Sequence, residues 1–170
     1  MHTIFCPSRM NDFEVKLLTQ NSLQELQAFI DLFNDFFQLC EGKKGSAAGI
    51  LTACPPTKDI QQDKFVLGFY QKEHLLGLID LIANYPQNST WTIGYLLIHP
   101  SYQRQGLGAQ FFHVLEQAIS PNKMRCVVQE QNERAFKFWQ TLGFKMVYQR
   151  EDNLGKLVNK TFVLEKGRLV

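Results

Sequence analysis

A glycine-containing loop between a predicted strand and a predicted helix carries the clearest chemical signal in the chain. The loop runs from Gln103 to Ala109 and has glycines at positions 106 and 108. Glycine lets a ligand approach the backbone closely, and the first N–H groups of a helix, together with the helix dipole, form a site for anions. Arg104 can add a charge-assisted contact. We therefore expect this loop to bind a diphosphate.

Two common phosphate-binding motifs do not fit the loop. The P-loop motif G-x-x-x-x-G-K-[ST] is absent from the sequence. The dinucleotide fingerprint needs a third glycine where this chain has Phe111, and it needs alternating parallel strands and helices. The strands before this loop are instead predicted to form hairpins. A Gly-x-Gly loop alone is weak evidence, because an ordinary turn before a helix can use the same residues.

The hydrophobic pattern places the loop in an α+β chain. Apolar runs predict strands at residues 14–19, 65–70, 74–83, 91–98 and 124–129, and a closing strand pair at 145–150 and 157–165. Apolar residues at helical spacing predict helices over residues 23–41, 107–119 and 132–142. Residues 42–63 are predicted to be a loop, or a short helix plus a loop. The central strands follow one another through short turns, so we expect an antiparallel meander.

Composition sets further limits. A chain of 170 residues suits one domain spanning 1–170, and the net charge of +2 is too small to predict binding to nucleic acid or to a membrane. No apolar run approaches the roughly 18–20 residues of a membrane helix, and the N-terminus has no signal-peptide pattern. Cysteines 6, 40, 54 and 126 have no metal-ligand spacing. We expect free thiols, no metal site and a cytoplasmic protein.

Two sequence blocks together resemble a known family. Gln103-Arg104-Gln105-Gly106-Leu107-Gly108 fits the pattern Q/R-x-x-G-x-G/A and follows Leu96-Leu97-Ile98-His99-Pro100. The segment from Asn132 to Phe144, with Ala135, Phe138, Trp139 and Gly143, is similar to N-x-x-A-x-x-F-Y-x-x-x-G-F. These are the motifs of the GCN5-related N-acetyltransferase (GNAT) superfamily, in the expected order. The order of strands and helices also fits, except over residues 1–12 and 42–63.

The resemblance implies the GNAT fold: a mostly antiparallel twisted sheet, splayed between its fourth and fifth strands, with helices on both faces. Those strands are residues 91–98 and 124–129 here. In the family, acetyl-CoA is the cosubstrate and enters the splay, where its pantetheine amides can pair with open backbone groups. By this resemblance the cofactor-binding residues are Leu96, Leu97, Ile98, Gln103, Arg104, Gln105, Gly106, Leu107, Gly108, Ala109, Asn132, Ala135, Phe138 and Trp139. For Phe138 and Trp139, a place in the hydrophobic core is the open alternative.

Candidates for proton transfer are harder to identify. An amine of pKa about 10.4 costs about 4.6 kcal/mol to deprotonate at pH 7, so a base or a water wire must accept the proton. Histone-acetylating members carry a glutamate where this chain has Thr92. Asp80 interrupts an apolar strand, where a charge is costly unless paired or used, and we expect it to lie across from about Tyr95. Glu130 is the second candidate base. A structural role stays open for both acids.

The general acid is a departure from the family. Many members place a tyrosine where this chain has Trp139, whose indole N–H only donates. Protonation of a thiolate whose thiol has a pKa of about 8.5 contributes at most about 2 kcal/mol at pH 7. The reaction can therefore proceed without a tyrosine as general acid. Tyr95 or water could substitute.

The resemblance implies an N-acetyltransferase that moves the acetyl group of acetyl-CoA to a primary amine of a small molecule or peptide by direct attack. The alternative is a non-catalytic acyl-CoA-binding sensor or partner module, which Thr92 and Trp139 favour. The first helix usually builds the acceptor side in this family. Here it offers Asp31, Phe33, Asp35, Phe36, Phe37 and Glu41, which suit a cationic amine unless they are simply core and solvated residues. A homodimer is compatible with the sequence.

Overall fold

The computed structural model describes residues 9–10, 13–154 and 157–168. Within these ranges the strands form one sheet in the order β1-β2-β3-β4-β5-β6-β8-β7. The strands are β1 (Arg9–Met10), β2 (Phe13–Leu17), β3 (Lys64–Gln71), β4 (His74–Ile82), β5 (Thr90–Ile98), β6 (Lys123–Gln129), β7 (Lys145–Leu154) and β8 (Leu157–Gly167). The helices are α1 (Leu23–Asp31), α2 (Asn34–Glu41), α3 (Ala47–Thr52), α4 (Leu107–Ile119) and α5 (Glu133–Thr141).

The sheet confirms the expected splay. Neighbouring strands pair antiparallel throughout the described sheet, except that β5 and β6 pair parallel after the α4 crossover. The β5–β6 ladder ends at the pair Ile93–Cys126, although β6 continues to pair with β8 as far as Gln129. The two strands therefore part in the middle of the sheet. They are the fourth and fifth strands expected from the sequence, because the short β1 was not predicted.

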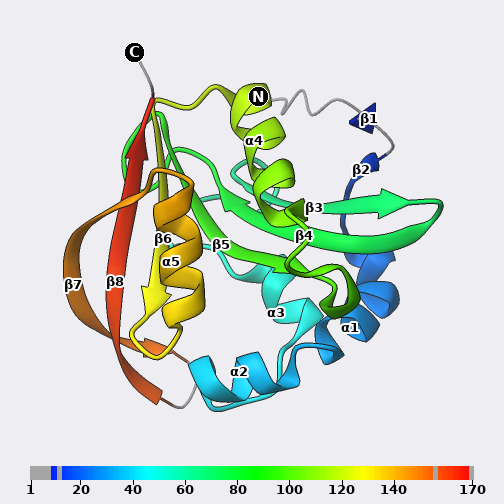
Figure 1. Cartoon of the computed structure of the whole chain (residues 1–170), viewed down its shortest axis with the longest axis horizontal. Coiled ribbons are helices and arrows are strands. Elements are labelled where there is room, and N and C mark those ends of the chain that lie inside the picture. The colour runs from blue at the N-terminus through cyan, green and yellow to red at the C-terminus, as the bar shows by residue number, and fades with distance from the viewer. Residues whose placement is uncertain (1–8, 11–12, 155–156, 169–170) are drawn as a thin grey trace.

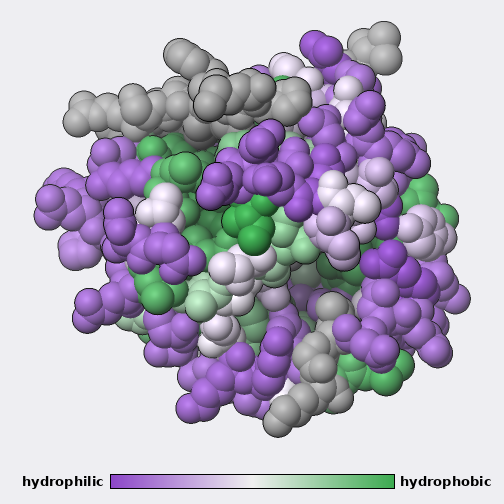
Figure 2. Space-filling model, turned by 180° about the vertical axis from the view of Figure 1, so that it is seen from behind, coloured by the Kyte–Doolittle hydropathy of each residue, from purple (hydrophilic) through white to green (hydrophobic). Residues whose placement is uncertain are grey.

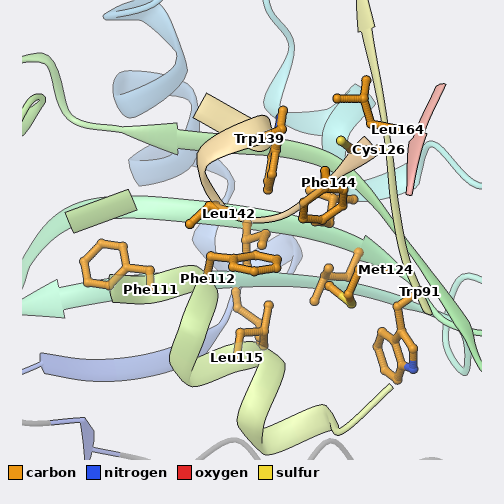
Figure 3. Packing of buried hydrophobic residues seen from close by; sticks show 14 of the residues in the cluster. Trp91, Phe111, Phe112, Leu115, Met124, Cys126, Trp139, Leu142, Phe144 and Leu164 are labelled. Atoms are coloured by element: carbon orange, nitrogen blue, oxygen red, sulfur yellow. The ribbon is translucent and has the colours of Figure 1, made fainter. Parts of the chain in front are cut away.

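Helices cover both faces of the sheet, and each face has its own core. On the face that is in front in Figure 1, α4 and α5 enclose a cluster that includes Phe111, Phe112 and Leu115. Figure 3 shows Phe112 on the side of Trp139 of α5 and Phe144, whereas Phe111 points away from them. On the other face, α1, α2 and α3 cover a second cluster, built from residues such as Leu26, Ile30, Phe37, Ile50 and Leu78.

Two predicted segments differ from the structure. The helix predicted over 23–41 is two helices, α1 and α2, which break at Leu32 and Phe33. The break carried no sequence signal because both residues are apolar and continue the helical spacing. Within residues 42–63, the predicted loop contains α3, whose first turn is capped by the Ser46 hydroxyl, which accepts a hydrogen bond from the Gly49 N–H at 3.0 Å. Among the described helices, none is long and apolar enough to span a membrane.

Candidate active site

The start of α4 presents free backbone donors. Its N-cap is Gly106, which has φ of 80° and offers no side chain to cap the helix. The first backbone bond of the helix runs from the Gln110 N–H to the Gly106 carbonyl at 3.0 Å. The N–H groups of Leu107, Gly108 and Ala109 therefore have no acceptor within the helix, and they lie at its positive end. A Cβ added at Gly106 would meet nothing within 4 Å, so the approach to these donors is open.

Glutamine side chains shape the loop before α4. Gln103 donates from Nε2 to the carbonyl of Ile98 at 2.9 Å, and Gln105 donates to the carbonyl of Ser101 at 3.1 Å. These bonds hold the loop against the end of β5. Arg104 is exposed and lies in the left-handed region with φ of 60°. Because both glutamine side chains already bind backbone carbonyls, an anion would be bound by the backbone N–H groups of the loop.

Helix α5 forms the neighbouring wall. The Asn132 side chain accepts a hydrogen bond from the Ala135 N–H at 3.2 Å and so caps α5. Phe138 reaches across to α4, because a Cβ at Gly108 would lie 3.3 Å from its ring and 3.5 Å from Ile98. The structure thus brings together three of the sequence-predicted positions from β5, α4 and α5.

Trp139 lies elsewhere, in the core. It is 6% exposed, and its ring centroid lies 5.7 Å from that of Phe112 and 5.0 Å from that of Phe144 (Figure 3). Its indole packs against both rings and belongs to the core cluster under α4 and α5. The structure therefore places Trp139 in the core, the alternative stated for it, rather than in the cofactor wall. Neighbouring residues of a helix face different directions, which is why Phe138 and Trp139 differ.

The open edge of β5 begins after Ile93. The described residues place no strand against Gly94–Ile98 on the β6 side, so backbone groups on this edge can pair with a ligand. The side chains of Leu96 and Ile98 pack toward the α4–α5 cluster. Leu97 packs into the opposite cluster under α1–α3, so only its backbone could meet a ligand in the splay.

A bulge positions Asp80 beside the splay. On β4, Leu81 pairs with Ile93 of β5 and Ile79 pairs with Leu96. Between these two pairs, the single residue Asp80 therefore faces two residues of β5, Gly94 and Tyr95. The expectation that Asp80 lies across from about Tyr95 is confirmed. A Cβ at Gly94 would overlap the Asp80 carboxylate, so this strand position requires glycine.

Asp80 is buried and ion-paired. It is 3% exposed, and its Oδ1 lies 2.6 Å from Nζ of Lys64, which is 7% exposed. Burial raises the pKa of Asp80 to about 6, although Lys64 acts in the opposite direction. Above that pH the carboxylate is ionised and is a stronger base than an ordinary aspartate.

Tyr95 and Glu41 form a second polar pair on the same face. The Tyr95 hydroxyl donates a hydrogen bond to the carboxylate of Glu41, the last residue of α2, which is 8% exposed. Burial and then the Glu41 carboxylate raise the pKa of Tyr95 far above its ordinary value, so the phenol stays protonated. The rings of Phe36 and Phe37 lie 6.5 and 5.7 Å from that of Tyr95.

The remaining candidates lie apart from this group. Glu130 is exposed and pairs with Lys160 of β8 at 3.1 Å. The Thr92 hydroxyl donates to the carbonyl of Tyr85 at 2.6 Å. Asp31 and Asp35 are exposed, in agreement with solvated acids.

Sequence reasoning missed Lys64 and named Glu41 without singling it out. Nothing in the sequence connects Lys64 with Asp80, because Lys64 lies 16 residues earlier, at the first position of β3. Only the antiparallel register of β3 and β4 brings the two residues together. Glu41 was one of four acidic residues on the first predicted helix. Only its burial and its bond to Tyr95 single it out.

Comparisons with known proteins agree on the fold. A family model described as an acetyltransferase (GNAT) domain matches residues 47–156. A Salmonella typhimurium acetyltransferase that modifies the N-terminal serine of 50S ribosomal subunit protein L7/L12 superposes with a TM-score of 0.75 at 12% identity, covering 93% of this chain and 96% of that one. A Bacillus subtilis acetyltransferase in complex with CoA gives a TM-score of 0.58 at 14% identity, covering 92% and 99%.

A curated relative is also similar. It is a regulatory protein RecX from Clostridium tetani, 24% identical over 132 residues, which cover 74% of this chain and 61% of the relative. The chain thus spans about three fifths of the length of that relative.

Proposed function

The chain belongs to the GNAT acetyltransferase family, and from that premise we propose that it transfers the acetyl group of acetyl-CoA to a primary amine of a small molecule or peptide by direct attack. The observation that carries the proposal is the uncapped N-terminus of α4 beside the open edge of β5. Together they offer an anion site and a strand edge in one continuous surface.

The residues present fit acetyl-CoA. When bound, acetyl-CoA supplies a thioester carbonyl as the electrophile. The N–H groups of Leu107, Gly108 and Ala109 would hold its diphosphate, with Arg104 adding a charge from the loop. The backbone of Leu96 and Ile98 would pair with the pantetheine amides, and Phe138 would form the wall. The CoA complex of the Bacillus subtilis acetyltransferase supports this reading.

The opposite face of the splay would handle the amine proton. Asp80 lies at the bulge, beside the point where β5 and β6 part. We assign it the role of general base, which accepts the proton of the attacking amine directly or through a water molecule. Tyr95 already donates its proton to Glu41, so its oxygen would accept a hydrogen bond from the amine and hold it in place. The same bond and the raised pKa make Tyr95 a poor general acid, which leaves protonation of the departing thiolate to water.

The acceptor class is supported by one likeness. The Salmonella typhimurium acetyltransferase modifies a protein N-terminus, which favours a peptide amine for this chain as well. The buried Glu41 and the rings around Tyr95 suit a cationic amine of either kind.

A thiol-release assay with acetyl-CoA and a panel of amines tests the proposal. The panel should include N-terminal seryl and alanyl peptides, a lysine peptide and simple alkyl amines. We expect CoA release above the uncatalysed background with at least one amine. A protein that binds acetyl-CoA by calorimetry but releases no CoA with any of them would instead be the acyl-CoA-binding sensor.

A further inference from the structure

The C-terminal end of α2 is capped by side chains from distant parts of the chain. The last carbonyl groups of an α-helix have no donor within the helix and need partners elsewhere. Asn159 of β8 donates from Nδ2 to the carbonyl of Cys40 at 2.7 Å, across 119 positions of sequence. Gln131, in the turn before α5, donates from Nε2 to the carbonyl of Leu39 at 3.1 Å, across 92 positions. These bonds tie α2 to the half of the sheet that lies beyond the splay.

Asn159 is the centre of this connection. It is 5% exposed, and its Oδ1 accepts a hydrogen bond from Gln131 at 2.7 Å, so both ends of its amide are engaged. A Cβ added at Gly42, the C-cap of α2, would lie 3.0 Å from Cγ of Leu157. Figure 1 shows α2 beside the end of the β7–β8 hairpin where β8 begins. The end of α2 is therefore held by both hydrogen bonds and packing.

The residue placed by this cap is Glu41, which follows Cys40 and ends α2. A carboxylate at a helix C-terminus faces the negative end of the dipole, and a buried carboxylate is costly unless it has partners. Glu41 is 8% exposed and accepts the Tyr95 hydroxyl, and its ion pair with the half-exposed Lys43 is long, at 3.7 Å. Helix stability alone does not explain an acid at this position, whereas a need for its carboxylate beside Tyr95 does.

The α1–α3 side of the sheet has room for an acceptor. Figure 2, which shows the molecule from behind, has a hollow near the middle of this side, with hydrophobic residues at its floor and hydrophilic ones around it. Glu41 and Tyr95 come from two elements on this side, α2 and β5. Their relative position therefore depends on how firmly α2 is fixed to the sheet.

We propose that Asn159 is a positioning residue for the acceptor amine. By holding the carbonyl of Cys40, it keeps the Glu41 carboxylate against the Tyr95 hydroxyl, and this bond turns the Tyr95 oxygen so that it accepts a hydrogen bond from the amine. Asn159 itself contacts neither the amine nor acetyl-CoA in this assignment. The inference rests on the proposed acetyl transfer and adds to it a residue that acts through α2.

The first test needs neither ligand nor turnover. Amide hydrogen exchange is followed in the parent, Asn159→Ala and Thr161→Val. Thr161 is the matched control, because it lies two residues along β8 on the same face and is fully buried, but its hydroxyl donates to Asp152 of β7 at 2.8 Å. Exchange in a peptide covering 38–44 should be about 10-fold faster in Asn159→Ala and unchanged in Thr161→Val. Both variants should unfold a few degrees below the parent.

The second test measures CoA release with saturating acetyl-CoA. N-terminal seryl and alanyl peptides, a lysine peptide and propylamine are the acceptors, and the one with the highest kcat/KM for the parent is used for the variants. Asn159→Ala should raise KM for this amine by about 5–10-fold, the value of about one hydrogen bond, and leave kcat within about 2-fold. Thr161→Val should leave both constants within about 2-fold, although it loses similar stability.

A double-mutant cycle shows whether Asn159 acts through Tyr95. In the Tyr95→Phe background the phenol oxygen is gone, so adding Asn159→Ala should leave KM for the amine within about 2-fold. The two losses of unfolding temperature should instead add. Gln131→Ala, at an exposed position, should give the same changes in exchange and KM at smaller size. It takes the place of Asn159→Ala if that variant does not fold.

The outcomes separate this proposal from the transfer reaction. Slow exchange or an unchanged KM in Asn159→Ala overturns the positioning role while acetyl transfer stands. A KM that rises by the same factor with and without the Tyr95 hydroxyl also overturns it. A parent that releases no CoA with any of the amines overturns the transfer reaction, whereas faster exchange confined to the end of α2 in Asn159→Ala still supports the hold on Glu41.

Discussion

On the α4 side of the β5–β6 splay the site is made of backbone, whereas on the α1–α3 side it is made of buried side-chain charges. The first side uses three helix N–H groups, a strand edge and glycines that keep the approach open. The second side uses an ion pair and a tyrosine–glutamate bond, contributed by β3, β4, β5 and α2.

This difference explains why one side can be read from sequence and the other cannot. A site made of backbone needs glycine at set positions in a short segment, so its signal is local. A site made of charges needs only that side chains from distant strands converge, and the same fold can host many such sets. The proposed cofactor side could therefore be predicted from the sequence, whereas the proposed acceptor side became visible only in the structure.

Asp80→Asn should have the largest effect, because it removes both the proposed base and the ion-pair partner of Lys64. If Asp80 accepts the amine proton, turnover should fall by about 10²–10⁴-fold while acetyl-CoA affinity stays within about 2-fold. The variant also leaves the Lys64 ammonium buried without its partner, which should cost about 3–5 kcal/mol of unfolding free energy. Steady-state CoA release, calorimetry and denaturant unfolding measure the three quantities.

The double variant Lys64→Met, Asp80→Asn separates catalysis from stability. Removing both charges should restore most of the unfolding free energy but none of the turnover. Recovery of turnover together with stability would make Asp80 a structural residue and leave Glu130 or a water wire as the base.

The pH dependence of kcat/KM gives a second test of Asp80 as the base. Burial raises the pKa of Asp80 to about 6, so its basic form is present above that pH and disappears below it. With an alkyl amine, log kcat/KM should rise with slope 2 below pH 6, where both groups must lose a proton, and with slope 1 above it. Asp80→Asn should show slope 1 throughout. A slope of 1 in the parent at pH 5 would count against Asp80 as the base.

Gly108→Asp should break the backbone side. Its carboxylate would stand at the N-terminus of α4, among the donors assigned to the diphosphate, and its Cβ would lie 3.3 Å from the Phe138 ring. We expect acetyl-CoA affinity to fall by about 100-fold or more by calorimetry, as charge-assisted bonds are lost. Stability should hold or rise, because an acid in the first turn of a helix is favourable by about 0.3–1 kcal/mol.

Gly108→Asn is the control for charge. It has nearly the same shape as the aspartate variant but leaves the helix terminus positive. Its loss of affinity should be clearly smaller. If both variants bind acetyl-CoA as tightly as the parent, the diphosphate does not lie over this turn.

Much of the fold could be predicted, for reasons visible in particular elements. The meander from β3 to β5 has strong alternation and short turns, and α4 and α5 show clear helical spacing. The break between α1 and α2 could not be seen, because Leu32 and Phe33 keep the apolar pattern while the backbone turns. The same holds for the ion pair of Lys64 with Asp80, because only the β3–β4 register brings these two residues together.

Tyr95→Phe tests the charged side more gently. Losing the phenol removes the donor to the Glu41 carboxylate, which stays buried, so unfolding free energy should fall by about 1–3 kcal/mol. If the Tyr95 oxygen also holds the amine, kcat/KM for the amine should fall by about 10-fold, and acetyl-CoA affinity should not change. Glu41→Gln keeps an acceptor for the phenol and should lose less stability. A Tyr95→Phe variant with unchanged amine kinetics would reduce the pair to a structural bond.

The smallest effects should come from two neighbours on α5 that face opposite sides of the comparison. Trp139 lies in the core between Phe112 and Phe144, whereas Phe138 lies against Gly108 at the mouth of the splay. Trp139→Phe should therefore lower unfolding free energy by about 1–2 kcal/mol and leave acetyl-CoA affinity within about 2-fold, since it removes buried volume and no ligand contact. Phe138→Leu should do the reverse, with affinity lower by about 3–5-fold and stability lower by less than about 1 kcal/mol. Calorimetry and denaturant unfolding of both variants measure the contrast. If Trp139→Phe weakens acetyl-CoA binding more than Phe138→Leu does, the ligand contacts Trp139 rather than Phe138, and the cofactor wall assigned to Phe138 is wrong.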